Sequence, residues 1–423
     1  MLDIKFIREN PDAVKTALNN RKAEADVDGL LKFDQLRRAA ITEAEKLKTE
    51  RNAASKTIGA LMKEGKKDEA EVAKEEVRKI GDRIAVLDEQ VRDFDEKISN
   101  IILYIPNLPS AATPVGASEE DNPVLRTIGE KKEVDFDVKP HWDICEELKL
   151  VDFERGAKIT GSGFPVYTGQ GARLQRALIQ FMLDLHTVEH GYTEVEPPFV
   201  CNASAMTGTG QLPKFSEDMY YIDTDELYPV PTAEVPLTNL YGDEIIDAEK
   251  PIKLTAYTPC FRREAGAAGS TNRGLLRLHQ FDKVEMVNFV KPEQSEAQHE
   301  ILVAEAEKVL QLLGLHYRVI ELCTADLGFS AAKCYDIELW APGVERWLEV
   351  SSVSNFGDYQ ARRARIRCRD ENGKPQFIHT LNGSGVALPR LVVAIIENYQ
   401  NADGTVTVPE ALRPHMGGLE KLG

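Results

Sequence analysis

Two long amphipathic patterns dominate the first quarter of the chain. Apolar residues recur at alternating spacings of three and four over residues 77–101, and the same spacing runs over residues 40–61 with one break at Arg51. This is the heptad pattern of helices that pack along a seam. The two seams flank the polar residues 63–68, in which Gly65 is a natural helix break. The pattern predicts an antiparallel helical hairpin over about residues 27–103, with its tip near 63–68 and a length of roughly 45–50 Å.

A coiled coil between two chains, with no ligand, would satisfy the same seams. The short connecting loop and the two matched seams favour a hairpin within one chain. Pro106 and Pro109 end the second helix. From this pattern alone, both a pure interaction module and a ligand-binding arm remain open.

The remainder of the chain alternates between strand-like and helical patterns. Strands are expected at residues 192–195, 283–289 and 347–350, and helices at 174–190, 293–313 and 391–399. This alternation predicts an α+β domain on a mostly antiparallel sheet. The predicted organisation is a helical arm over residues 1–105, a polar linker over 106–140 and a catalytic domain over 141–423.

Charge and composition narrow the partners. The 423 residues carry 69 acidic and 52 basic side chains, a net charge of −17, which argues against a nonspecific nucleic-acid coat. Residues 26–103 hold 16 basic and 18 acidic side chains and are nearly neutral. Lys63, Lys66 and Lys67 near the tip are therefore placed to reach a polyanion. The N-terminal residues lack an apolar core and no apolar run reaches membrane-spanning length, so a soluble, cytoplasmic protein with no membrane partner is expected.

Several familiar motifs are incomplete. The six cysteines form no CxxC pair, and the glycine-rich segments complete neither a dinucleotide-binding nor a P-loop pattern. His186 and His190 are four residues apart, but the glutamate of a zinc-binding HExxH helix is missing. These residues favour an apolar helix face over a metal site.

Four other clusters are more specific. They are a helix, strand and Pro197-Pro198; Phe261-Arg262-Arg263-Glu264 with a returning strand from Arg277; Glu349-Val350-Ser351-Ser352; and a glycine-bearing turn at Asn382-Gly383-Ser384-Gly385 before Pro389-Arg390. The first, second and fourth clusters resemble motifs 1, 2 and 3 of class II aminoacyl-tRNA synthetases, and the Glu349–Ser352 cluster narrows the resemblance further. The stretches TGQLPKF (209–215), PTAEVPLTN (231–239) and HQFDKVE (279–285) narrow the resemblance. With the arm, the chain resembles bacterial-type seryl-tRNA synthetases over essentially its whole length.

The resemblance implies an ATP-dependent ligase that works in two steps. The carboxylate of L-serine attacks the α-phosphate of ATP to give seryl-adenylate and pyrophosphate, and the seryl group then passes to the 3′-terminal ribose of tRNA. Charge accumulates on phosphate and acyl oxygens, so positioning and cationic stabilisation should dominate. Arg262 and Arg390 match the catalytic arginines of motifs 2 and 3.

The resemblance also assigns the ATP site. Glu264 matches the residue that accepts from the adenine amino group, and Phe281 matches the aromatic on which adenine stacks. Glu349 and Ser352 supply the oxygen ligands that Mg²⁺ prefers. The complete set that the resemblance implies for ATP is Arg262, Arg263, Glu264, Leu278, His279, Gln280, Phe281, Glu349, Val350, Ser351, Ser352 and Arg390.

The implied serine site must recognise a small hydroxyl. A buried acceptor such as Glu285 can require that hydroxyl and so reject alanine. Without the resemblance, Glu285 beside Lys283 would be interpreted as a surface residue of a strand. The residues that match the family's serine contacts are Thr232, Ala233, Glu234, Arg262, Glu285 and Ser384.

The family uses its arm to grip the long variable arm of tRNA-Ser across a homodimer, and it also charges tRNA-Sec. RNA helices are recognised largely by shape and phosphate contacts, which suits the near-neutral arm. The alternative is a class II-like ligase that loads a carrier protein, but such paralogues lack the arm. A departure from the family lies at residues 267–272, which lack an Arg-Asp pair common in the motif 2 loop.

Overall fold

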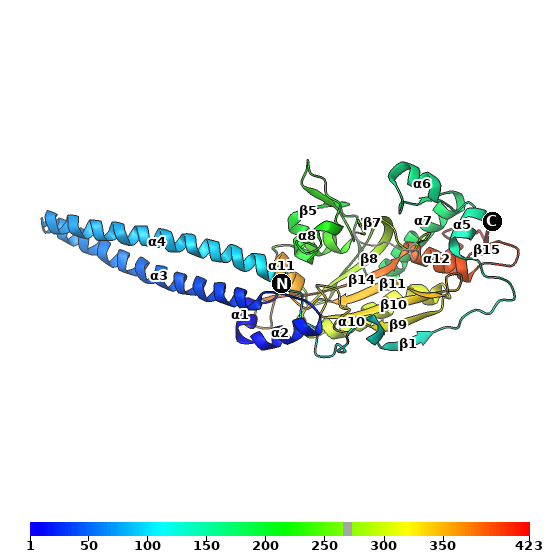
Figure 1. Cartoon of the computed structure of the whole chain (residues 1–423), viewed down its shortest axis with the longest axis horizontal. Helices are drawn as coiled ribbons and strands as arrows, with labels where there is room; N and C mark the ends of the chain where they lie inside the picture. Colours follow the sequence, from blue (N-terminus) through cyan, green and yellow to red (C-terminus); the bar gives the residue numbers. More distant parts are fainter. Residues whose placement is uncertain (265–272) are drawn as a thin grey trace. The chain divides into compact units, whose positions relative to one another are not determined.

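The computed structural model describes residues 1–264 and 273–423, and it divides into two compact units (Figure 1). The smaller unit holds residues 2–19 and 23–106, and the larger holds residues 1, 20–22 and 107–423. Each unit has buried apolar residues of its own. None of the helices in the described parts is long and apolar enough to cross a membrane.

The smaller unit is built on two long helices. These helices are α3 (Val27–Lys63) and α4 (Lys67–Ile102), and two short helices precede them, α1 (Ile4–Glu9) and α2 (Pro11–Asn20). Gly65, with a φ of 78°, takes the left-handed conformation in the turn between the long helices. Asp26 caps α3 by accepting from the Gly29 amide at 2.8 Å.

The seams of α3 and α4 meet within one chain. Ala40, Ala44 and Leu87 are buried between the helices, and the rings of Phe33 and Phe94 stack with centroids 6.3 Å apart. These are the two aromatic residues of the predicted hairpin, and their pairing fixes the register at its base. Apolar contact along the seam therefore holds the helices together, as the heptad spacing predicts.

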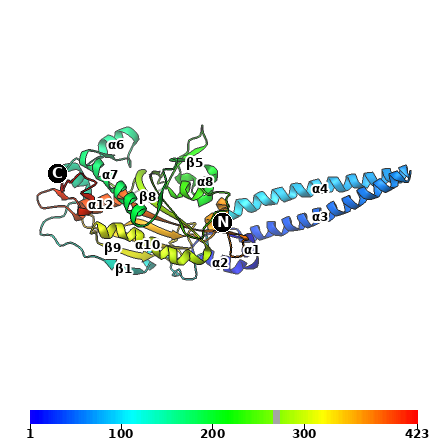
Figure 2. The same cartoon turned by 180° about the vertical axis from the view of Figure 1, so that it is seen from behind.

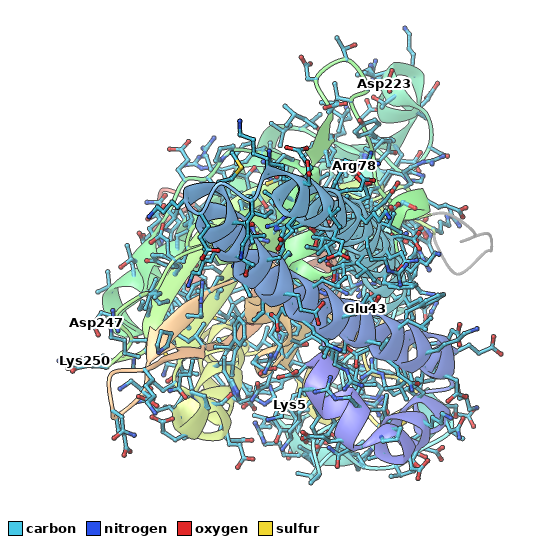
Figure 3. All side chains as sticks on the ribbon, turned by 90° about the vertical axis from the view of Figure 1, so that its left-hand side faces the viewer. Lys5, Glu43, Arg78, Asp223, Asp247 and Lys250 are labelled. Carbon is cyan, nitrogen blue, oxygen red and sulfur yellow. The ribbon has the colours of Figure 1, made fainter. Side chains whose placement is uncertain are left out.

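Charged side chains cover the outside of this helical pair. Glu43 pairs with Arg83 at 2.8 Å across the two helices, and Lys48 pairs with Asp88 at 3.1 Å. Figure 3 views the pair from its tip and labels Glu43 and Arg78, which are both exposed. Exposed pairs of this kind contribute about 0–1 kcal/mol each. They keep the arm solvated more than they stabilise it.

The larger unit contains an eight-stranded sheet, which confirms the predicted α+β class. The strands run in the order β1-β9-β10-β11-β14-β8-β7-β4, and only the short β4–β7 pair is parallel. Their bounds are β1 (Val124–Ile128), β4 (Thr193–Glu194), β7 (Ile252–Phe261), β8 (Gln280–Val290), β9 (Tyr317–Glu321), β10 (Lys333–Ala341), β11 (Arg346–Asn355) and β14 (His379–Ala387). Strand β1 lies within residues 106–140, so the predicted linker is partly ordered into the sheet.

One face of this sheet is covered by three helices, α7 (Gly169–Asp184), α10 (Ser295–Leu312) and α12 (Leu388–Asn398). Figure 2 shows α10 lying along the sheet from behind. Val284 and Met286 of β8 join this core, whereas Lys283 and Glu285 alternate onto the opposite face. The strand period therefore places a charged pair on the face that the three helices leave free.

Smaller elements complete the unit. The helices are α5 (His141–Glu147), α6 (Phe153–Thr160), α8 (Ala203–Thr209), α9 (Glu234–Asn239) and α11 (Tyr359–Ala364), with 3-10 turns at Glu119–Asp121, Ser216–Asp218, Pro292–Gln294 and Glu410–Leu412. The short strands are β2 (Val151–Asp152), β3 (Val166–Tyr167), β5 (Val200–Asn202), β6 (Leu227–Pro229), β12 (Arg367–Arg369), β13 (Pro375–Phe377), β15 (Val406–Thr407) and β16 (Lys421–Leu422).

Two local predictions require correction. The helix predicted over 174–190 begins at Gly169 and changes after Asp184 to a π-helical turn, Leu185–Glu189. Residues 382–385 are not a turn but part of strand β14. The glycines there permit close packing, because a Cβ on Gly385 would lie 2.7 Å from His186 Nε2. Glycine within a strand permits this close approach, so the glycines here do not indicate a turn.

Candidate active site

The pairing of β7 with β8 brings the motif 2 residues together. Phe261 and Gln280 are opposite each other at the end of this pair, so Arg262 and His279 follow immediately. The Arg262 amide donates to the His279 carbonyl at 2.9 Å and extends the ladder by one rung. Arg262 therefore leaves the sheet at a fixed angle. Its guanidinium lies 5.2 Å from the ring centroid of Phe281, within cation–π range.

A cavity of about 370 Å³ opens on the sheet face opposite the three helices. Most of the side chains that were predicted from the sequence to bind ATP and serine line this cavity. The predicted residues that line it are Thr232, Glu234, Arg262, Glu264, Leu278, Phe281, Glu349, Val350, Ser352, Ser384 and Arg390. Residues up to 158 positions apart in sequence thus share one site.

One end of the cavity holds a buried polar network. The Glu285 carboxylate accepts from Lys283 Nζ at 2.5 Å, from Thr232 Oγ1 at 2.9 Å and from Asn382 Nδ2 at 3.0 Å. Glu285 is fully buried, whereas its three donors line the cavity. Ser384 is its partner across the β14–β8 pair. Glu285 is thus an interior residue that holds the cavity floor, not a surface residue of the strand.

Glu234 lies beside this network and has a perturbed pKa. Burial first, and then the neighbouring Glu285 carboxylate, raise the pKa of Glu234 to about 7. A hydrogen bond from Gln360 and the charges of Lys283 and Arg262 lower it. Because Glu234 lines the cavity, it is a carboxylate whose charge responds to pH near neutrality and to any cation that enters.

Glu264 and Arg277 flank the cavity near Phe281. Arg277 Nε donates to Glu264 Oε2 at 2.6 Å, and Glu264 has a left-handed φ of 49°. The exposed Arg277 therefore orients a carboxylate at the cavity mouth. Residues 265–272 lie outside the described part of the chain, and the departure noted at 267–272 falls among them.

Acidic and basic groups meet at the remaining end. Arg390 Nη1 donates to the Glu349 carbonyl at 2.7 Å and lies 3.5 Å from its carboxylate. Ser352 Oγ is 3.1 Å from Cys334 Sγ. Burial and the nearby Glu349 charge raise the pKa of Asp336 well above its usual range. Two carboxylates close enough to perturb each other form an environment that favours a cation.

Six predicted residues do not line the cavity. Arg263 donates to the Glu217 carbonyl at 3.2 Å, outside the cavity, and His279 stacks on Phe164 with centroids 5.4 Å apart. Ser351 Oγ donates to the Ser384 carbonyl at 2.6 Å and so supports a lining residue from behind. The others are Ala233, Gln280 and Glu285.

Four residues close to the site received no site role from the sequence, although three of them lie within the recognised motifs. Lys283, Asn382 and Arg277 line the cavity, and Gln360 donates to Glu234 from behind it. Strand alternation could have found Lys283, because it shares a face with Glu285. Gln360 lies on the short helix α11, where no local pattern indicates that its side chain points toward the site.

Residues 328–331 form one wall of the cavity, and the segment 327–331 is held from behind. Arg21 donates to the carbonyls of residues 327, 328 and 331 at 3.0, 2.7 and 2.9 Å. Asn107 donates to the carbonyls of residues 329 and 330 at 3.0 and 2.9 Å. Every carbonyl of this wall is therefore bonded to one of two residues that flank the helical arm in sequence.

The remaining predicted positions lie elsewhere. Lys63, Lys66 and Lys67, here called the tip lysines, are exposed where α3 turns into α4. His186 and His190 are in contact through their Nδ1 atoms at 3.0 Å. Burial lowers the pKa of His186 to about 3. No group of three metal-ligating His, Cys, Asp or Glu side chains occurs among the described residues.

Comparisons with known proteins cover both units. A family model described as "Seryl-tRNA synthetase N-terminal domain" matches residues 1–109, and one described as "tRNA synthetase class II core domain (G, H, P, S and T)" matches residues 217–399. The serine–tRNA ligase of Pelotomaculum thermopropionicum is 54% identical, with 100% of each chain covered. That of Methanosarcina barkeri is 53% identical, with 100% of this chain and 99% of its own covered.

A solved structure agrees with these sequence matches. The crystal structure of seryl-tRNA synthetase from Pyrococcus horikoshii, complexed with ATP, has a TM-score of 0.94 at 38% identity. The match covers 100% of this chain and 99% of that one.

Proposed function

Because this chain belongs to the seryl-tRNA synthetase family, we propose that its cavity binds L-serine beside ATP, forms seryl-adenylate and passes the seryl group to tRNA-Ser. The observation that carries the proposal is the single cavity that unites the motif 2 arginine, the motif 3 arginine and the Thr232–Glu285 network. By family, the chain is an ATP-dependent serine–tRNA ligase. The geometry supports a division of its cavity into three parts.

Serine is assigned to the end of the cavity that holds the Thr232–Glu285 network. Its ammonium meets Glu234, and its hydroxyl meets the group of Thr232, Ser384 and the donors that Glu285 holds. These polar groups are buried, so an amino acid without a hydroxyl would forgo a buried hydrogen bond to them, at a cost of about 0.5–1.5 kcal/mol, or about 1.5–3 kcal/mol where the partner is charged. Selection for serine over alanine follows from that cost.

Adenine is assigned to the Phe281 face, with Glu264 accepting from its amino group. Arg262 lies between the two ends and is placed to bind both the serine carboxylate and the α-phosphate with its planar fork. Arg390 is assigned to the outer phosphates. The positive charges of Arg262 and Arg390 stabilise the negative charge that develops on the phosphate oxygens during attack, and no covalent enzyme intermediate is needed.

Mg²⁺ fits the third part of the cavity. Glu349 and Ser352 both line the cavity and offer oxygen. Burial first, and then the neighbouring Glu349 charge, raise the pKa of Asp336 well above its usual range. Mg²⁺ is commonly held by one or two carboxylates together with substrate phosphates. When bound, it would neutralise phosphate charge, while Arg390 and Glu349 orient the phosphate chain.

The arm is assigned to tRNA. The tip lysines and the near-neutral surface of α3 and α4 suit contact with an RNA backbone. We extend the proposal to tRNA-Sec, to action as a homodimer and to a cytoplasmic location, as the family resemblance implies. The alternative of loading a carrier protein has no feature in its favour, because the arm that such paralogues lack is present here.

The test is serine-dependent exchange of pyrophosphate into ATP. Arg262→Ala should reduce exchange at least about 100-fold, the scale seen when one preorganised charge-stabilising group is removed. Arg369→Ala is a matched control, because Arg369 lies on β12 and donates only locally, to the Gly373 carbonyl at 2.8 Å. Full exchange by Arg262→Ala would refute the assignment.

A further inference from the structure

A buried relay of two neutral side chains supports Glu234 on the side away from the cavity. Gln360 Nε2 donates to Glu234 Oε1 at 2.6 Å and to the Thr209 carbonyl at 3.2 Å. Thr380 Oγ1 donates to Gln360 Oε1 at 2.8 Å. Gln360 and Thr380 are both fully buried, and neither lines the cavity.

This arrangement determines which way the amide points. The threonine hydroxyl has one hydrogen, and it is directed at Gln360 Oε1, so the amide oxygen is engaged. Both hydrogens of the amide nitrogen are then directed at acceptors, Glu234 and the Thr209 carbonyl. A flipped amide would place its oxygen against the Glu234 carboxylate, acceptor to acceptor, and would leave Thr380 facing a donor.

The relay also leaves the charge of Glu234 available. An arginine or lysine at position 360 would neutralise the carboxylate and compete with an incoming ammonium. A neutral amide orients the carboxylate and favours its ionised form without supplying a counter-charge. The charged groups that act on Glu234 are Glu285 and Lys283 from β8 and Arg262 after β7.

We propose that Gln360, oriented by Thr380, is a positioning residue that aims Glu234 at the serine ammonium and favours the ionised form of that carboxylate. The inference rests on the proposed function, because it assumes that Glu234 receives that ammonium. Gln360 touches no substrate and acts only through Glu234. Its loss should therefore change both the affinity for serine and the pH at which Glu234 titrates.

The experiment is calorimetric titration of the full-length protein with L-serine from pH 6 to 8, in two buffers of different ionisation enthalpy, which yields the protons released per serine bound. In Gln360→Met, the pH midpoint of proton release should move upward, and the Kd for serine at pH 7 should rise about tenfold or more, because a hydrogen bond to a charged group is lost. The Kd for a non-hydrolysable ATP analogue should stay within twofold.

Position 380 offers a milder, matched pair of variants. Thr380→Val keeps the shape but removes the hydroxyl, so the amide loses its orientation, and the Kd for serine should rise about fivefold with a smaller upward shift of the midpoint. Thr380→Ser keeps the hydroxyl and should behave as the parent protein.

The outcomes separate the two proposals. Weaker serine binding with an unmoved midpoint in both Gln360→Met and Thr380→Val would overturn the relay and leave Gln360 a structural residue. A parent protein that binds serine without releasing protons would overturn the role of Glu234, and the relay with it. A parent protein that binds no serine would refute the proposed function itself.

Discussion

Lowering the pH from 8 to 6 should weaken serine binding through Glu234 alone. The Glu234 residue is 8% exposed, and burial together with the neighbouring Glu285 raises the pKa of its carboxyl to about 7. An ammonium binds the ionised carboxylate, so serine must displace any proton there. With a pKa of about 7, the Glu234 carboxyl of the free protein is about 10% protonated at pH 8, about 50% at pH 7 and about 90% at pH 6.

The number of protons released on binding serine and the change in Kd follow from these fractions. About 0.1 proton should be released per serine at pH 8, about 0.5 at pH 7 and about 0.9 at pH 6. The Kd for serine should be flat above pH 8 and should rise toward a tenfold change per pH unit below pH 6. Serine binding weakens as the pH falls, because the ionised form of Glu234, which binds the ammonium, is lost as the pH drops through its raised pKa. Serine's own ammonium stays protonated over this range.

Calorimetry without ATP is the suitable assay, because ATP titrates in the same range. Glu234→Gln is the control, since an amide cannot release a proton, and its serine affinity should be weak and independent of pH. Proton release that stays near zero at pH 6 in the parent protein, with serine still bound, would refute the reasoning. So would an equal release in Glu234→Gln.

Three further outcomes are expected. Glu285→Gln leaves the Lys283 ammonium without its buried partner, so it should destabilise the protein by about 3 kcal/mol. Adding Lys283→Met to this variant should recover part of the lost melting temperature. If the destabilising effects of the two substitutions simply add, the pairing of Lys283 with Glu285 is contradicted. Arg21→Met removes the side-chain donor to the carbonyls of Leu327, Gly328 and Ala331, of which, among the described residues, only the Gly328 carbonyl also accepts from a backbone amide, that of Ala331. It should cost at least about 2 kcal/mol, measured by thermal unfolding, and should raise the KM for serine. Replacing all three tip lysines with alanine should weaken tRNA charging several-fold and leave pyrophosphate exchange unchanged; a loss of exchange would mean that these side chains support the fold.

The arm could be predicted from the sequence because its information is local. Heptad spacing, the Gly65 break and the two phenylalanines all report on contacts between neighbouring turns or across one seam. The helix ends at Lys63 and Ile102 lie within a residue of the predicted tip and end. The π-helical turn after Asp184 could not be predicted from local spacing, and it contains His186, which approaches Gly385, a residue distant in the sequence.

The site was only partly accessible to sequence reasoning. Local motifs with family resemblance identified Arg262, Glu349 and Arg390, which the structure brings to one cavity. The surface interpretation of Glu285 failed because alternation along a strand shows which residues share a face, but not which face is buried. Gln360 lies 126 residues from Glu234, and only the tertiary fold brings them to 2.6 Å.

Transfer of labelled serine onto total bacterial tRNA, with ATP and Mg²⁺ and with alanine and threonine as controls, tests the central claim most directly. The account predicts that serine alone is attached, that attachment requires ATP and that Arg262→Ala abolishes it. Serine-dependent pyrophosphate exchange with no tRNA product would favour the carrier-protein alternative. Attachment of alanine at a comparable rate, or no exchange with serine at all, would contradict the assignment of the serine site.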